Sequence, residues 1–92
     1  MAQQLSAVAT SIVVLLNNIT ALCVESQNRC MARDTMQALE VYARNKAFRL
    51  PSEKIQNFYD VLIDSRPLTL SSILHDIATD VVHGDIALRK PS

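Results

Sequence analysis

The N-terminal stretch over residues 5–23 reads LSAVATSIVVLLNNITALC and contains no charged side chain. Its larger aliphatic residues recur at alternating gaps of three and four, which is the period of a helix with one apolar seam. The seam consists of Leu5, Val8, Ile12, Leu15, Ile19 and Leu22. Because Ala9, Leu16 and Cys23 widen this seam on one flank, most of the helix circumference is apolar. The pattern predicts a helix over about residues 4–26 that is central and largely enclosed.

A second helix is predicted over about residues 30–48, after the first polar segment of the chain. Its apolar face consists of Ala32, Met36, Leu39, Ala43, Ala47 and Leu50. The polar segment contains no Gly or Pro, so the chain either turns there or continues the first helix; we favour a turn near residues 26–29. Asp34 and Gln37 resemble a capping box. Pro51 closes the helix, because the residue before a proline avoids the α region.

Two more helices are predicted from the same apolar period. The third covers about residues 53–64, with Ser52 as its N-cap. The fourth covers about residues 70–83 and comes after Thr69, which is a suitable capping residue. Gly84 then occupies the position where a left-handed C-terminal cap is expected.

The composition favours helices joined by short connections. One Gly and three Pro among 92 residues are too few for an all-β fold, which needs frequent turn residues. Short connections make neighbouring helices antiparallel. We therefore expect an all-α protein, a small bundle of about four helices, with a single helical domain over residues 1–84 and a short tail over residues 85–92.

The charges sum to zero, with nine basic and nine acidic side chains, but they are unevenly distributed. The second predicted helix and the turn after it carry a candidate basic surface: Arg29, Arg33, Arg44, Lys46 and Arg49. This surface either pairs with the acidic third and fourth helices, within the fold or across a dimer, or it meets the phosphates of a nucleic acid. Pairing is favoured, because Asp60 and Asp64 on the helix after the Pro51 turn would repel a duplex.

Neither export nor membrane insertion is expected for the uncharged N-terminal segment. The first residues lack the basic side chains of a secretory signal. A membrane span needs about 20 predominantly apolar residues. This segment is interrupted by Thr10, Ser11, Asn17, Asn18 and Thr20. We expect a cytoplasmic protein that does not contact a membrane.

No group of residues resembles a metal or catalytic site. Four residues could ligate zinc, namely Cys23, Cys30, His75 and His83, but both pairs are spaced more widely than in structural zinc sites. Asp76, Asp80 and His83 share a helix face and could exchange protons, but no nucleophile or cofactor motif accompanies them. We expect no metal, no cofactor and no enzymatic activity.

The excess of aliphatic helix surface favours a function in binding. The expected function is a protein–protein interaction module, that is, an accessory, chaperone-like or regulatory protein that binds a protein partner or itself as a homodimer. The alternative is a nucleic-acid-binding regulator that uses the basic surface. The candidate interface comprises Leu5, Val8, Ile12, Leu15, Leu16, Ile19 and Leu22. This seam either fills the interior of the bundle or contacts another subunit.

Overall fold

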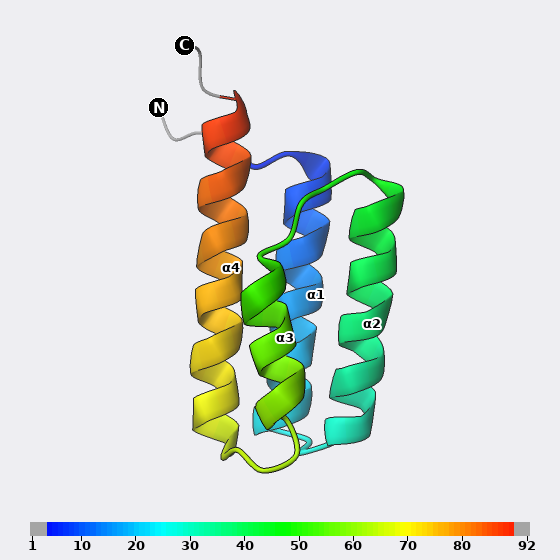
Figure 1. The fold of residues 1–92 in the computed structure, drawn as a ribbon, viewed down its shortest axis with the longest axis vertical. Helices are drawn as coiled ribbons and strands as arrows, with labels where there is room; N and C mark the ends of the chain where they lie inside the picture. Colours follow the sequence, from blue (N-terminus) through cyan, green and yellow to red (C-terminus); the bar gives the residue numbers. More distant parts are fainter. Residues whose placement is uncertain (1–3, 90–92) are drawn as a thin grey trace.

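A computed structural model of the chain describes residues 4–89, which form four α-helices and no strand. The helices are α1 (Ala7–Val24), α2 (Arg29–Asn45), α3 (Ser52–Val61) and α4 (Pro67–Arg89). Neighbouring helices run antiparallel and surround a common axis (Figure 1). The predicted all-α bundle of four helices is confirmed.

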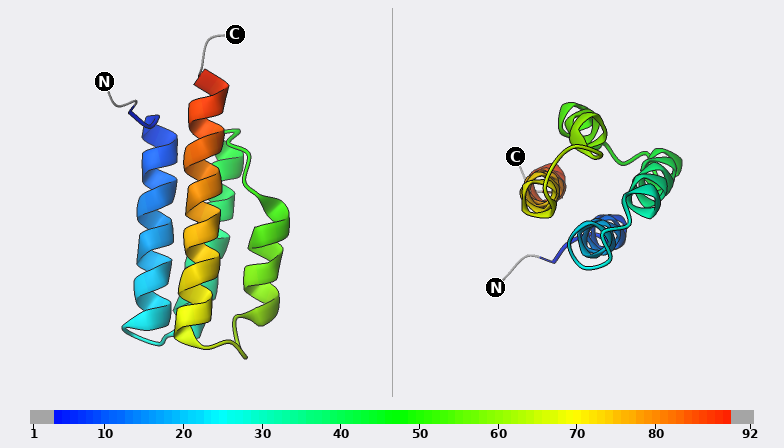
Figure 2. Two further views of the ribbon diagram at one scale, coloured as in Figure 1. Left: turned by 90° about the vertical axis from the view of Figure 1, so that its left-hand side faces the viewer. Right: turned by 90° about the horizontal axis from the view of Figure 1, so that it is seen from below.

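The four helices form a ring when the bundle is viewed along its long axis (Figure 2). The most extensive packing joins α1 to α4, the first and last helices of the chain. α1 also packs against α2, and α3 packs against α4. The α3 helix is the shortest, with 10 residues, whereas α4 has 23. The C-terminal end of α4 therefore extends beyond the other helices (Figure 1).

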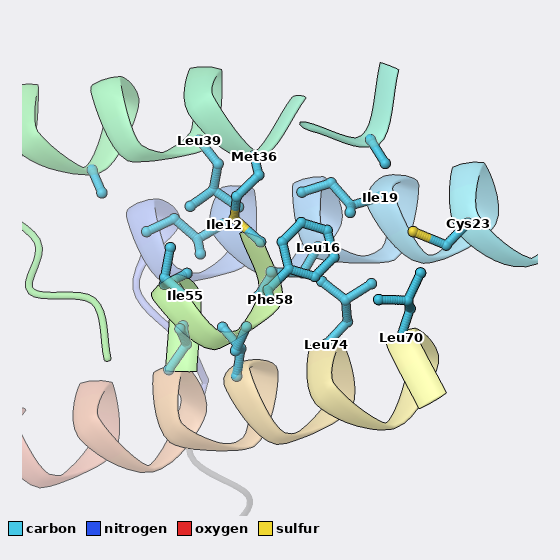
Figure 3. Close-up of a cluster of buried hydrophobic side chains, with 14 of the residues drawn as sticks. Ile12, Leu16, Ile19, Cys23, Met36, Leu39, Ile55, Phe58, Leu70 and Leu74 are labelled. Carbon is cyan, nitrogen blue, oxygen red and sulfur yellow. The ribbon is translucent and has the colours of Figure 1, made fainter. Parts of the chain in front are cut away.

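All four helices contribute side chains to one apolar core, and Phe58 of α3 lies at its centre (Figure 3). The other large, fully buried residues are Ile12, Leu16, Ile19, Cys23, Met36, Leu39, Leu70, Leu74, Ile77 and Val81. Complete burial of one such side chain is worth about 1.5–3 kcal/mol. Aliphatic residues and a single buried phenylalanine thus account for the stability of the bundle.

The α1 helix is less enclosed than its sequence suggests. Its buried residues are Ala9, Ile12, Leu16, Ile19 and Cys23, again at alternating gaps of three and four. Leu5, Val8, Leu15 and Leu22 of the predicted seam are only partly buried against this core. Only 28% of the residues of α1 are buried. The expectation of a largely enclosed central helix is therefore wrong, because α1 takes one place in a ring of four.

Two turns contain residues with left-handed backbone conformations. Gln27 (φ 48°) lies between α1 and α2, and Ala47 (φ 54°) comes after α2. At the end of α2, the Phe48 N–H donates to the Ala43 carbonyl at 2.8 Å and the Ala47 N–H donates to the Arg44 carbonyl at 3.1 Å. These two bonds form a Schellman motif, in which the left-handed residue is usually Gly.

The turn before α2 lies where it is predicted, near residues 26–29. Asn28 is the N-cap of α2, and its side chain accepts a hydrogen bond from the Met31 N–H at 3.1 Å. The predicted capping box is wrong, since Asp34 and Gln37 lie inside α2. Asn28 caps the helix instead, because it immediately precedes the first helical residue. There its side chain can accept a hydrogen bond from an N–H of the first turn, which has no partner within the helix.

Both predicted caps of α3 and α4 lie within the first turn of their helices. α3 begins at Ser52 after the N-cap Pro51, and α4 begins at Pro67, before Thr69. Proline suits such positions because it lacks the N–H that would remain without a helical partner.

The fourth helix is longer than expected at its C-terminal end. Gly84 lies within α4 and does not have positive φ, so the prediction that it caps the helix is wrong. The predicted tail over residues 85–92 is also wrong for residues 85–89, which are helical. Its last residues, 90–92, lie outside the described residues. Asp85 explains the extension, since its buried side chain has partners that hold this turn in place.

Candidate interaction surfaces

The described residues form an apolar groove of about 390 Å³. It lies beside the C-terminal half of α4, where the connection between α2 and α3 passes. Its lining residues are Phe48, Arg49, Pro51, Asp80, Val81, Gly84, Ala87 and Leu88. Below, this surface is called the α4 groove.

The α4 groove exists because α3 starts late in the chain. The Schellman motif at Ala47 turns the chain so that Phe48 packs partly against the core. Pro51 then delays the start of α3 to Ser52. The C-terminal turns of α4 therefore have no full-length helix opposite them. Leu88 is 82% exposed there, although it is a large aliphatic residue.

Charged side chains border the α4 groove on one side. Lys54 of α3 contacts the Oδ2 atoms of Asp80 at 2.9 Å and Asp76 at 3.1 Å. These hydrogen bonds, the one to Asp80 first, raise the pKa of Lys54. Asp80 lines the groove together with Arg49, which is exposed on the connecting segment. The apolar floor thus has charges of both signs at its edge.

At the same end of the bundle, Asp85 connects α4 to the segment before α1. Only 4% of Asp85 is exposed. Its carboxylate accepts hydrogen bonds from the Ser6 backbone N–H at 3.0 Å and from Ser6 Oγ at 2.7 Å. Arg89 Nη2 contacts the same carboxylate at 3.0 Å and also donates to the Gln4 carbonyl. These contacts fix the outer turn of α4 and with it one wall of the α4 groove.

The residues of the candidate interface fall into two groups in the structure. Ile12, Leu16 and Ile19 are buried in the core, so they could contact another protein only if the bundle unfolded. Leu5, Val8, Leu15 and Leu22 retain partial exposure. Val14, which lies outside the predicted seam, is 52% exposed. The outward face of α1 is therefore uncharged but displays fewer large side chains than the seam implied.

The residues of the candidate basic surface are not gathered in one place. Arg29, at the start of α2, donates to the Leu62 carbonyl at 2.5 Å and to the Ser65 carbonyl at 2.6 Å. It thereby binds carbonyl groups at the end of α3. Arg33 lies 3.7 Å from Asp34.

The remaining basic residues of this set lie at the other end of α2. They are Arg44, Lys46 and Arg49, and all three are exposed. Because an α-helix rises about 1.5 Å per residue, Arg44 lies roughly 16 Å along α2 from Arg33 and roughly 22 Å from Arg29. The five residues therefore do not form one continuous stripe.

The candidate metal and catalytic residues do not form one site, because Asp76 and Asp80 contact Lys54 whereas His75 and His83 line a different hollow. Among residues 4–89, no three His, Cys, Asp or Glu side chains are grouped as metal ligands. Cys23 is buried and Cys30 is exposed, and both are free thiols. Burial raises the pKa of the Cys23 thiol, although Arg29 opposes this effect. A partly buried hydrogen bond joins Tyr59 to Glu40, and burial followed by this hydrogen bond raises the pKa of Tyr59.

The α4 groove could not be located from the sequence, because Gly84 there resembles a helix terminator. One signal was present. Leu88 continues the buried stripe of α4 one heptad after Val81, and Arg89 lies at the i, i+4 spacing of an ion pair from Asp85. Comparisons of the chain with protein-family models, with curated proteins and with solved structures found no match.

Proposed function

We propose that this chain is a small protein–protein interaction module, an accessory, chaperone-like or regulatory protein that acts by binding rather than by catalysis. The observation that supports the proposal is the α4 groove, an apolar hollow of about 390 Å³ with the exposed Leu88 at its edge. Apolar pockets of this size, bordered by a few polar groups, are typical of binding sites.

Exposed aliphatic side chains elsewhere support the same function. Besides Leu88, the large exposed apolar residues among residues 4–89 are Val14, Met31, Val41, Ile63 and Leu68. Single exposed residues are ordinary on protein surfaces, but a hollow beside one of them can hold a partner side chain. The formal net charge of zero gives little repulsion between copies, so self-association is a natural form of this binding.

Two measurements test the proposed function. Light scattering behind size exclusion should give a species near twice the chain mass of 10.2 kDa at micromolar concentration. In parallel, the immobilised chain should retain a reproducible set of proteins from a native lysate, and the variant Leu88→Asp should lose them. Ile63→Asp, which alters an equally exposed residue on another surface, is the control. A monomer that retains nothing would contradict the proposal.

Nucleic-acid binding is the less favoured function, since Arg29 is engaged with carbonyl groups and Arg44, Lys46 and Arg49 lie at the other end of α2. A gel-shift assay with nonspecific duplex over a salt series distinguishes the two. Binding that weakens steeply with salt would favour nucleic acid, because phosphate contacts release counterions.

Residence in the cytoplasm, away from membranes, is part of the proposal. One helix of the described residues, α1, is long and apolar enough to cross a membrane, with a mean hydropathy of 2.0. A core helix of a soluble bundle and an N-terminal signal both have this composition. We favour the core helix because Ile12, Leu16 and Ile19 are buried in the apolar core and α1 packs against α4 and α2. Fractionation tests this, and recovery in carbonate-washed membranes would contradict it.

A further inference from the structure

Gly84 is the only glycine of the chain, and it lies within α4 on the floor of the α4 groove. A glycine within a helix lowers stability relative to alanine, so its presence calls for a local reason. Crowding inside the protein is not the reason. Beyond the adjoining backbone of α4, a Cβ atom added at Gly84 would meet no atom within 4 Å.

Backbone conformation does not explain Gly84 either. The described chain has two residues with left-handed backbone, Gln27 and Ala47, and neither is a glycine. Gly84 itself does not have positive φ. One physical role of a glycine in a helix is to let another molecule approach the helix backbone closely. The α4 groove opens at this residue, so the approach would come from outside the bundle.

The surface around Gly84 contains both the apolar α4 groove and an exposed aliphatic side chain, Leu88, which is of a kind that can fill such a groove. Leu88, 82% exposed, projects one turn beyond Gly84, while Phe48, Pro51 and Val81 line the apolar hollow. A two-fold symmetric interface uses one patch twice, so that patch must be complementary to itself. A patch with both parts meets this requirement.

The position of Leu88 along α4 fits such an arrangement. Two antiparallel helices that cross at Gly84 bring the residue four positions after it against the residues three and four positions before it. Leu88 of one copy then faces Val81 and Asp80 of the other, and both line the groove. The C-terminal end of α4 extends beyond the neighbouring helices (Figure 2). The chain has no net charge, and its rim carries Arg49 and the partly exposed Asp80, which also pairs with Lys54, so charges of opposite sign on two copies can meet there.

We infer that two copies of this chain pair through the α4 groove, with their α4 helices crossing antiparallel at Gly84 and each Leu88 seated in the groove of the other. This inference rests on the proposed function and specifies its interface. The α1 seam then serves the interior of each bundle, and the contact between subunits lies on the last helix.

Sedimentation equilibrium of the full chain, from about 1 µM to about 1 mM, tests the inference. The wild-type chain should dimerise. Gly84→Leu and Leu88→Ser should each raise the dissociation constant about 30-fold or more, the effect of losing a central interface residue. Leu68→Ser is the matched control, since Leu68 is 78% exposed near the opposite end of α4 and should leave dimerisation unchanged.

Gly84→Ala provides a second test, because it should change stability and dimerisation in opposite directions. A glycine needed only for the fold of the monomer would not give this result. Because nothing surrounds the added methyl group, thermal stability of the monomer should rise, while dimerisation weakens. Folding of Gly84→Leu is verified by circular dichroism. A wild-type chain that stays monomeric over the whole range overturns the inference, as does a dimer that neither Gly84→Leu nor Leu88→Ser weakens.

Failure of the inference is distinguishable from failure of the proposed function. If the dimer withstands the Gly84→Leu change but Val14→Lys on α1 dissociates it, binding is retained and the α4 interface is refuted. If the wild-type chain is monomeric but captures another protein from a lysate, pairing of copies is refuted and the proposed function stands. A monomer that captures nothing refutes both.

Discussion

Replacing Asp85 with Ala should destabilise the bundle more than any other exchange of an acidic residue. The carboxylate accepts two hydrogen bonds from Ser6 and contacts Arg89, all within 3.0 Å. A hydrogen bond to a charged group contributes about 1.5–3 kcal/mol, and bonds that share one acceptor group do not add fully. We expect a loss of about 3 kcal/mol. For a chain of this size, that corresponds to a decrease in Tm of roughly 12–24 °C.

The effect of Asp85 should depend on pH. The Ser6 backbone N–H, with the Ser6 hydroxyl and Arg89, holds the pKa of Asp85 below its ordinary value of 3.8, although burial opposes the shift. A carboxyl group with a lowered folded-state pKa stabilises the fold above its unfolded-state pKa. This stabilisation is lost as the pH falls through the folded-state value. The difference between wild type and Asp85→Asn should thus be full at pH 7 and shrink below about pH 4.

Urea denaturation followed by far-UV circular dichroism measures both effects. The free energy of unfolding is determined for the wild type, Asp85→Ala and Asp85→Asn at several pH values. Asp64→Ala, which removes an exposed carboxylate between α3 and α4, should stay within about 0.5 kcal/mol of wild type. A loss below about 1 kcal/mol for Asp85→Ala, or a difference that does not change with pH, would refute the role assigned to this carboxylate.

Three further predictions concern other parts of the bundle. Ala47→Gly should raise the free energy of unfolding by about 1 kcal/mol, because glycine adopts a φ of 54° without strain; thermal melting measures this, and no gain would contradict it. Arg29→Ala should cost about 1.5–3 kcal/mol in urea denaturation, since two carbonyl groups lose a charged donor, whereas Arg33→Ala should have little effect. A thiol reagent should modify Cys30 in the native protein and Cys23 only after unfolding; equal rates would show that the core is open.

The number, order and type of the helices could be predicted because their apolar periods are regular. The connections were located by proline and by the polar segment between the first two helices. The buried face of α1 could not be predicted to within one position. On a helix without charges, apolar residues cover so much of the circumference that the sequence does not indicate which stripe faces inward. The structure buries Ala9 and Cys23 and leaves Val8 and Leu22 at the margin.

The end of α4 was mispredicted for a different reason. Gly84 has the local pattern of a helix terminator, but whether a helix ends there also depends on the tertiary contacts of the next turn. Asp85 and Arg89 keep their turn helical because Ser6 and Gln4, some 80 residues earlier in the chain, provide their partners. The local sequence around Gly84 does not indicate contacts with residues so distant in the chain. The α4 groove depends on the extended α4 and on the short α3. It therefore could not be predicted from the sequence either.

The link between Ser6 and Asp85 also has a kinetic consequence. It joins helices from opposite ends of the sequence, and α1 and α4 share the most extensive packing in the bundle. The segment between them, residues 25–66, must therefore close as a loop before this helix pair forms, which is slow for a helical protein. A circular permutant, with its ends joined by a short linker and a new opening between α2 and α3, would make these helices adjacent in sequence. We expect it to fold faster than the natural order.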